Sequence, residues 1–91
     1  MIVIGADTHK STHALAAVDA NTGQLRGERG ILARDVGHLE ALRWAHELDG
    51  EIVRAIEDCR DLCYHLEQAL LAAGERVVRV APKADGRLSA R

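Results

Sequence analysis

The order of apolar periodicities along the chain predicts an α/β fold with one mixed, five-stranded sheet and two helices. Three observations lead to this prediction. Short apolar runs with a period of two residues fill the first third of the chain. The period changes to that of a helix at Asp35 and again near Asp58, and a short apolar run follows each helical segment.

The first third reads as three consecutive strands. The run that ends on Asp7 is apolar on both faces until that acid, which is typical of a central strand. A second strand, His13–Asp19, is joined to a third, Gln24–Leu32, by a turn whose Gly23 supplies a positive φ. The third strand contains charged residues and glycines, which suits an exposed edge.

The two helical segments each have an apolar stripe and a glycine stop. The first starts with Asp35 as candidate N-cap and ends before Gly50, and the second runs from about Asp58 to Ala73 and is capped by Gly74. The inward residues expected in the first are Val36, Leu39, Leu42, Ala45 and Leu48, and in the second Leu62, Leu66, Ala69, Leu70 and Ala73. Short strands at 51–57 and 76–81 follow the helices.

The connections decide how these strands are arranged. Strands joined by short turns pair antiparallel, whereas strand-helix-strand units form right-handed crossovers between parallel neighbours. With the third strand at an edge and the first in the centre, the sheet order is 3-2-1-4-5, with strand 2 antiparallel. We expect one domain over 1–83 and a basic tail over 84–91.

The charge balance argues against a free-standing nucleic-acid binder. The chain of 91 residues has 12 Lys and Arg against 14 Asp and Glu, a formal charge of -2, and only Trp44 and Tyr64 as aromatic residues. Duplex DNA binders are basic, and single-strand binders need stacking aromatics. Neither a signal peptide nor a membrane-spanning run is present, so we expect a cytoplasmic protein with no membrane partner. Cys59 and Cys63 lie four residues apart on a predicted helix, too few and too close for a disulfide framework, so we expect reduced thiols.

Two acids mark a candidate metal site. Asp7 ends the first strand and Glu57 ends the fourth, and parallel neighbours bring such strand ends to one edge of the sheet. Mg²⁺ suits two carboxylates with water and phosphate oxygens, and metal ions at such sites serve phosphodiester chemistry. Alternatively, Asp7 is a turn residue, and Glu57 is a charge that favours the start of the second helix. His9 and His13 flank the acid turn and either polarise a water or phosphate or are simply exposed polar residues.

The segments ADTHKSTHALAAVD and IEDCRDLCYHLEQALLAAGERVVRVAPK resemble the N-terminal domain of DEDD-type insertion-sequence transposases. The catalytic domain of that family is similar to Holliday-junction resolvases of the RuvC type, and the resemblance spans Ile2 to Lys83. It implies a ribonuclease-H-like, three-layer fold whose four acids bind Mg²⁺, with Asp7 and Glu57 as the first two catalytic acids. It also implies a later domain with a nucleophilic serine, recombination of DNA, and in some members a structured guide RNA.

The chain departs from this family in one respect. The third and fourth acids of the family fall in a helix beyond the fifth strand, whereas this sequence ends at Arg91, with Asp85 and Ser89 as poor substitutes for an acid and the serine. The resemblance therefore implies a truncated catalytic domain that does not cleave DNA by itself. Candidate nucleic-acid contacts are His9, Lys10, Lys83 and Arg87. Exposed apolar residues of the fifth strand (Val77, Val78 and Val80) predict a homodimer.

Two other functional classes stay open. An actin-like or sugar-kinase-like ATP-binding lobe begins with a similar strand, acid turn and returning strand, which Asp19 and Gly23 fit. Such lobes need a glycine just after the acid, where this chain has Thr8, His9 and Lys10. A non-enzymatic module that pairs with full-length transposase is the second alternative.

Overall fold

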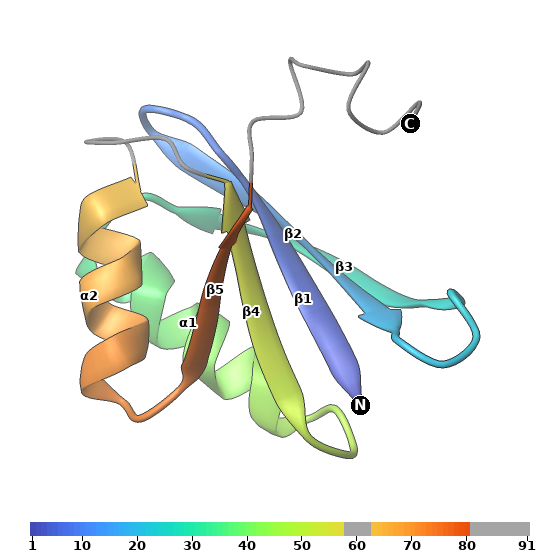
Figure 1. Ribbon diagram of the computed structural model, residues 1–91. Helices are drawn as coiled ribbons and strands as arrows, with labels where there is room; N and C mark the ends of the chain where they lie inside the picture. The colour runs from blue at the N-terminus through green and yellow to red at the C-terminus, as the bar shows by residue number, and fades with distance from the viewer. Residues whose placement is uncertain (58–62, 81–91) are drawn as a thin grey trace.

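A computed structural model describes residues 1–57 and 63–80 and confirms the expected topology (Figure 1). The elements are β1 (Ile2–Thr8), β2 (Thr12–Asp19), β3 (Leu25–Leu32), α1 (Asp35–His46), β4 (Ile52–Glu57), α2 (Tyr64–Ala72) and β5 (Arg76–Val80). The five strands form one sheet in the order β3-β2-β1-β4-β5. β2 is antiparallel to β1 and β3, whereas β4 is parallel to β1 and β5. No helix in the described ranges has the length and apolar character needed to cross a membrane.

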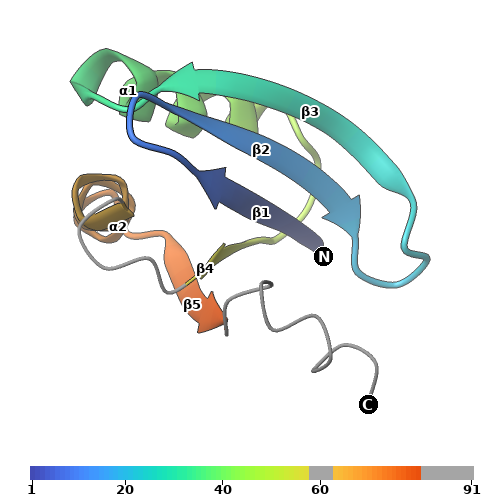
Figure 2. The same cartoon turned by 90° about the horizontal axis from the view of Figure 1, so that it is seen from above.

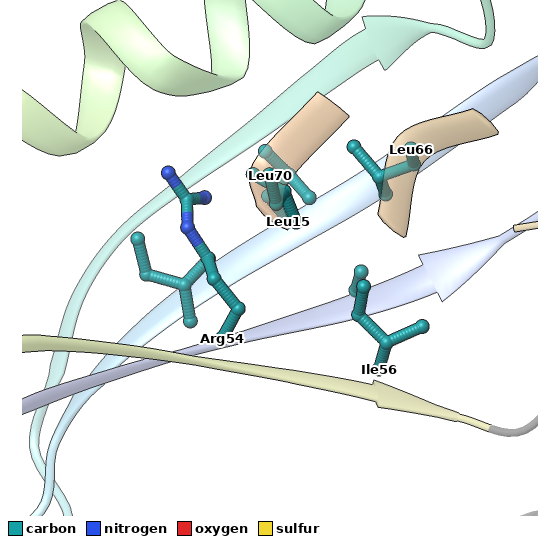
Figure 3. Close-up of a pocket in the computed structure, with 7 residues that line it drawn as sticks. Leu15, Arg54, Ile56, Leu66 and Leu70 are labelled. Atoms are coloured by element: carbon teal, nitrogen blue, oxygen red, sulfur yellow. The ribbon is translucent and has the colours of Figure 1, made fainter. Parts of the chain in front are cut away.

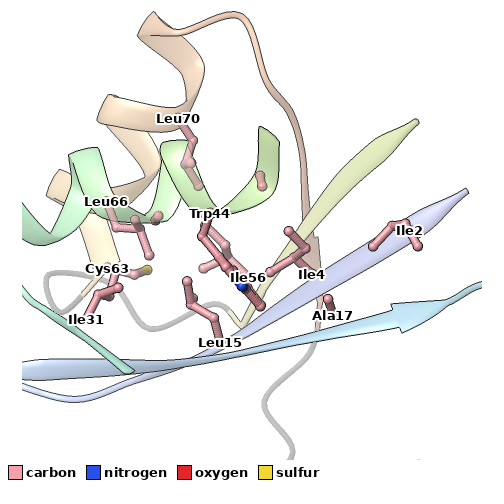
Figure 4. Packing of buried hydrophobic residues seen from close by; sticks show 12 residues of the cluster. Ile2, Ile4, Leu15, Ala17, Ile31, Trp44, Ile56, Cys63, Leu66 and Leu70 are labelled. Atoms are coloured by element: carbon pink, nitrogen blue, oxygen red, sulfur yellow. The ribbon is translucent and has the colours of Figure 1, made fainter. Parts of the chain in front are cut away.

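Both helices pack against the same face of the sheet (Figure 2). We call this the covered face and the opposite one the open face, because no helix of the described ranges lies on it. The covered face holds one aliphatic core, seen in Figure 4. Its strand residues are Ile2, Ile4, Leu15, Ala17, Ile31 and Ile56, and its other members are Ala41, Trp44, Ala45, Cys63, Leu66 and Leu70. Of the three layers that the resemblance implies, residues 1–57 and 63–80 supply the sheet and one helical layer.

Strand register assigns each residue to a face. Successive side chains of a strand point to opposite sides, so the buried Ile2 and Ile4 of β1 lie on the covered face, and Val3, Gly5 and Asp7 lie on the open face. Neighbouring strands follow the same alternation, because Ile4 is paired with Ala17 of β2 and Arg54 of β4. The open face therefore carries apolar side chains together with charged ones, including Glu28 of β3, Arg76 of β5 and, at one end, Asp7 and Glu57.

The buried stripe of α1 differs from the expected one. Val36 and Leu39 are 61% and 46% exposed, whereas the buried residues are Gly37, His38, Ala41, Trp44 and Ala45. A Cβ atom on Gly37 would lie 1.8 Å from the carbonyl oxygen of Leu32 in β3. This close approach of α1 to the end of β3 turns Gly37 and His38 inward, and it requires glycine. The N-cap is Arg34 rather than Asp35.

Arg54 is an unexpected member of the covered face. It is 2% exposed in the middle of β4, where its neighbours in the sheet are aliphatic. Its Nε donates to Oε1 of Glu75 at 2.9 Å, and its Nη2 donates to the carbonyl of Ala41 at 3.2 Å. The guanidinium thus links β4 to α1 and to the residue before β5, beside a small pocket whose apolar walls include Leu66 and Leu70 (Figure 3).

Cys63 also departs from expectation. It is buried at 3% exposure and is disulfide-bonded, so the expectation of a reduced thiol is wrong for this residue. The expectation placed Cys63 inside a helix, whereas α2 begins one residue later, at Tyr64. Cys59 and the expected helical residues 58–62 lie outside the described ranges.

Candidate metal centre at the end of the sheet

Asp7 lies at the carboxyl end of β1 on the open face. Its side chain is 72% exposed, and its Oδ2 is 3.4 Å from Nε2 of His9. A strand that is paired on both sides up to this point, antiparallel to β2 and parallel to β4, fixes the backbone of the acid. Asp7 therefore presents a solvent-accessible carboxylate from a rigid element.

Glu57 occupies the corresponding position on the neighbouring strand. The last register pair between β1 and β4 joins Ala6 to Ile56, so Asp7 and Glu57 each follow that pair by one residue. The two strands run in the same direction about 4.8 Å apart, and both acids belong to the open face. The sheet therefore brings the two candidate ligands to one end and one face, as the sequence predicts. We predict that the two carboxylates lie within about 8 Å of each other, which is close enough to share one Mg²⁺.

The donor set suits a single hydrated cation. Mg²⁺ is commonly held by one or two carboxylates and retains several waters, which suits the exposed Asp7 and the half-buried Glu57 at one end of the sheet. In residues 1–57 and 63–80, no group of three or more His, Cys, Asp or Glu side chains is placed to hold a metal ion. Asp7 and Glu57 are thus the two carboxylates that the described residues bring to this end of the sheet. Asp58, Asp61 and Asp85 lie outside those ranges.

The two histidines that flank the acid turn have different surroundings. His9 is exposed in the turn beside Asp7, and Lys10 is exposed next to it. His13 is 2% exposed and lies on the covered face, because it is paired with Thr8 rather than with Asp7. The expectation that His13 is an exposed residue acting on water or phosphate is therefore wrong. Its alternation with the buried Leu15 and Ala17 was a signal in the sequence that it faces the core.

The buried histidine belongs to a polar cluster that the sequence analysis missed. The rings of His13 and His38 are nearly parallel, at 5°, with their centroids 6.4 Å apart. Burial lowers the pKa of His13 and of His38 below the ordinary value. The hydroxyl of Thr8 is buried beside His13 without a hydrogen-bond partner in the described part of the chain.

The other candidate residues divide into those placed by the structure and those beyond it. Trp44 is 6% exposed, and its ring lies 3.3 Å from the position that a Cβ atom on Gly27 would take. The guanidinium of Arg29 lies 5.8 Å from the centroid of the Trp44 ring. Trp44 is thus a packing residue, as expected. The candidate nucleic-acid contacts Lys83 and Arg87 lie outside the described ranges, as does Ser89.

No protein-family model and no curated protein matches this sequence. Among solved structures, the chain is similar to RuvC of T. thermophilus in complex with a Holliday junction substrate, with a TM-score of 0.62 and 18% identity over 90% of this chain. It spans 65% of the length of that RuvC chain. Two Aquifex aeolicus structures of the Ppx/GppA family each give a TM-score of 0.46, at 14% and 13% identity. The matches cover 96% and 93% of this chain and 37% of each of those chains.

The likeness to RuvC, together with the strand order, establishes the fold of this chain. A mixed sheet in the order β3-β2-β1-β4-β5, with two helices after the third and fourth strands, is the ribonuclease-H-like arrangement shared with RuvC. At 18% identity the likeness extends to the fold alone.

Proposed function

We propose that this chain is part of the catalytic domain of a DNA-processing enzyme, specifically the N-terminal domain of a DEDD-type insertion-sequence transposase. The observation that carries the proposal is the position of Asp7 and Glu57, at the same end and on the same face of two neighbouring parallel strands. The fold shared with RuvC supports it, as does the DTHK sequence around Asp7.

In this proposal Asp7 and Glu57 hold a Mg²⁺ ion together with water. When bound, the metal activates an attacking oxygen and stabilises the leaving oxygen of a phosphodiester. His9, 3.4 Å from Asp7, restrains that carboxylate, and the exposed Lys10 of the same turn contacts a phosphate. The ATP-binding alternative is disfavoured, because His9 and Lys10 stand in the turn where a phosphate would need a glycine to approach the backbone.

We assign DNA binding mainly to other parts of the complete protein. A chain with a net charge of -2 lacks the basic surface that supplies most of the affinity for DNA. The DNA substrate and a structured guide RNA are inferred from the resemblance to the transposase family, and the cytoplasmic location is inferred from the lack of a signal-peptide pattern in the sequence.

A metal titration tests the assignment of the two acids. If Mg²⁺ binds the folded but not the unfolded chain, a free Mg²⁺ concentration of ten times the Kd stabilises the fold by roughly 1.4 kcal/mol. We expect the Tm rise to disappear in Asp7→Asn and in Glu57→Gln. Glu28→Gln is the matched control, because Glu28 lies on the open face of β3, away from the two acids. A rise that persists in both acid variants, or that Glu28→Gln also removes, would reject the site.

A cleavage assay tests the division of labour between this chain and the rest of the protein. With Mg²⁺ or Mn²⁺ and a labelled four-way junction, we expect no cleavage and a Kd weaker than about 10⁻⁵ M near physiological salt. The candidate site has two acids among the described residues, where the proposed chemistry uses four. Cleavage that vanishes in Asp7→Asn would show that the chain is sufficient by itself and would overturn this part of the proposal.

Self-association of the chain, the homodimer expected from the sequence, is favoured by a separate observation. Val78 and Val80 of β5 are 48% and 43% exposed on the open face, whereas Val77 packs against the core on the covered face, contrary to expectation. We propose that the open face binds a second copy of the chain. Light scattering at high concentration should give a dimer that Val78→Arg disrupts and that Leu71→Arg, on the exposed side of α2, leaves intact. A monomeric wild type would contradict this proposal.

A further inference from the structure

Apart from Arg54, the covered face contains a cluster of buried polar side chains near the end of the sheet where Asp7 lies. His13 of β2 and His38 of α1 are 2% and 5% exposed, and their rings are nearly parallel with centroids 6.4 Å apart. Thr8 lies opposite His13 in the register and contributes a buried hydroxyl that has no hydrogen-bond partner within the described ranges. The contact between α1 and the sheet at this end is therefore made by titratable side chains.

This cluster is hydrogen-bonded to the turn that follows Asp7. The backbone N–H of His9 donates to the carbonyl of Thr12 at 3.0 Å and also to Nδ1 of His13 at 3.3 Å. His13 must be neutral at Nδ1 to accept this bond, because protonation converts that nitrogen into a donor. The His9 ring in turn contacts the Asp7 carboxylate on the other side of the strand. A buried neutral histidine thus helps to fix the turn beside the candidate site.

We infer that the His13–His38 pair is an acid-sensitive support for the Asp7 turn, which proton uptake weakens together with the contact between α1 and β2. The inference rests on the proposed function only for the role of Asp7, because the support itself involves no metal and no DNA. Its physical basis is that two cations in one buried site destabilise the fold, because both are desolvated and they repel each other.

The surroundings of His13 mostly oppose its protonation. Burial is the largest cause that lowers its pKa, followed by the charge that His38 would carry, and His9 adds a smaller contribution in the same direction. The carbonyl of Thr12 acts in the opposite sense, because it can accept a hydrogen bond from the protonated ring, but it does not reverse the shift. The neighbours of His13 on β1 and β3 are Thr8 and Ile31, which carry no charge.

His38 has a similar balance on its side of the contact. Burial is again the largest cause that lowers its pKa, and the positive charge of His65 on α2 acts in the same direction. Asp35, one turn earlier in α1, raises it without reversing the shift. Among the causes of the two shifts in the described residues, Asp35 is the acid whose charge favours the cation.

The direction of the pH dependence follows from these shifts. In the unfolded chain both histidines have a pKa of about 6.5, and in the folded chain their pKa values lie below that. Between those values the unfolded chain binds more protons, so their contribution to stability is complete above about pH 6.5 and is lost as the pH falls toward the folded pKa values.

The test combines direct titration with a matched set of variants in metal-free buffer. In the wild type, NMR signals of the His13 and His38 rings should titrate below the ordinary histidine value, and protection of the His9 amide from hydrogen exchange should fall over the same range. The Tm should drop between about pH 7.5 and about pH 5.5, the interval in which histidines titrate. In the His13→Gln/His38→Gln double variant that drop should shrink to less than half, because glutamine can accept the bond but does not titrate. His46→Gln, at an exposed position of α1, should retain the full drop.

Several outcomes would overturn the inference. Ring signals of His13 and His38 that titrate at or above the ordinary value would do so, as would a double variant with the pH dependence of wild type. If the double variant does not fold, the ring titrations and the His9 amide exchange of the wild-type chain decide the question. A chain that binds no Mg²⁺ but shows these titrations would reject the metal site and retain the acid-sensitive support.

Discussion

The covered and open faces of the sheet are built from alternate residues of the same strands, yet they have different roles. On β1, Ile4 is 1% exposed beneath the helices, whereas the Asp7 side chain is 72% exposed on the other face. On β4, Arg54 is buried in a hydrogen-bonded contact with α1, and Glu57 ends the strand on the open face. The covered face therefore holds the apolar core, whereas the candidate metal ligands belong to the open face.

The largest expected difference in stability is between two ion pairs, one buried and one exposed, whose arginines lie on the neighbouring strands β4 and β5. Arg54→Met leaves the carboxylate of Glu75 and the carbonyl of Ala41 without their partner, and loss of one member of a buried pair costs about 3–5 kcal/mol. Arg76→Met breaks an ion pair with Glu51 whose side chains are 63% and 60% exposed, which should cost less than about 1 kcal/mol. Urea unfolding of both variants checks the difference. Equal losses would show that the two faces do not differ in this way.

Truncating one apolar side chain on each face gives the next contrast. Ile4→Ala removes a side chain that is 1% exposed in the core and should destabilise the chain by about 2–5 kcal/mol. Val78→Ala removes a side chain that is 48% exposed, and the loss should be below about 1 kcal/mol if the protein is monomeric during the measurement. A large loss in Val78→Ala at low protein concentration would mean that part of the chain covers the open face.

Two glycines provide a third and smaller contrast. Gly37→Ala places a methyl group 1.8 Å from the Leu32 carbonyl oxygen, so α1 must shift away from β3, at a cost of about 1–3 kcal/mol after the gain in helix propensity. Gly30→Ala adds a methyl group on the open face of β3, where nothing lies within 4 Å, and should be neutral or slightly stabilising. Thermal unfolding at pH 7 separates the two results, and an unaffected Gly37→Ala would show that α1 does not need this close approach.

The sheet was predictable from sequence because its signals are local and mutually constraining. Period-two runs, the Gly23 turn and the two crossovers leave one arrangement for five strands, and the structure confirms it. The alignment of Asp7 and Glu57 follows from the same topology, since both end parallel neighbours. Whether they bind metal depends on side-chain geometry and on further ligands, which topology does not determine.

The errors concern side chains whose orientation depends on another element. Apolar character alone favoured Val36 and Leu39 as the inward face of α1, whereas the contact between Gly37 and β3 sets the rotation of the helix. His13 and Arg54 were not expected in the core, because a buried polar residue is stable only with neighbours that come from elsewhere in the chain. The partners of Arg54 are Glu75 and Ala41, at sequence separations of 21 and 13 residues.

Paramagnetic broadening by Mn²⁺ tests most directly the claim that the open face holds a metal site at one end of the sheet. In the wild-type chain we expect dilute Mn²⁺ to broaden the amide signals of Thr8, Ala14 and Glu57, while those of Gly23 and Gly50, at the opposite end, stay sharp. In the Asp7→Asn/Glu57→Gln double variant, which should fold normally, the selective broadening should disappear. Equal broadening at both ends of the sheet, or selective broadening that survives in the double variant, would contradict the account.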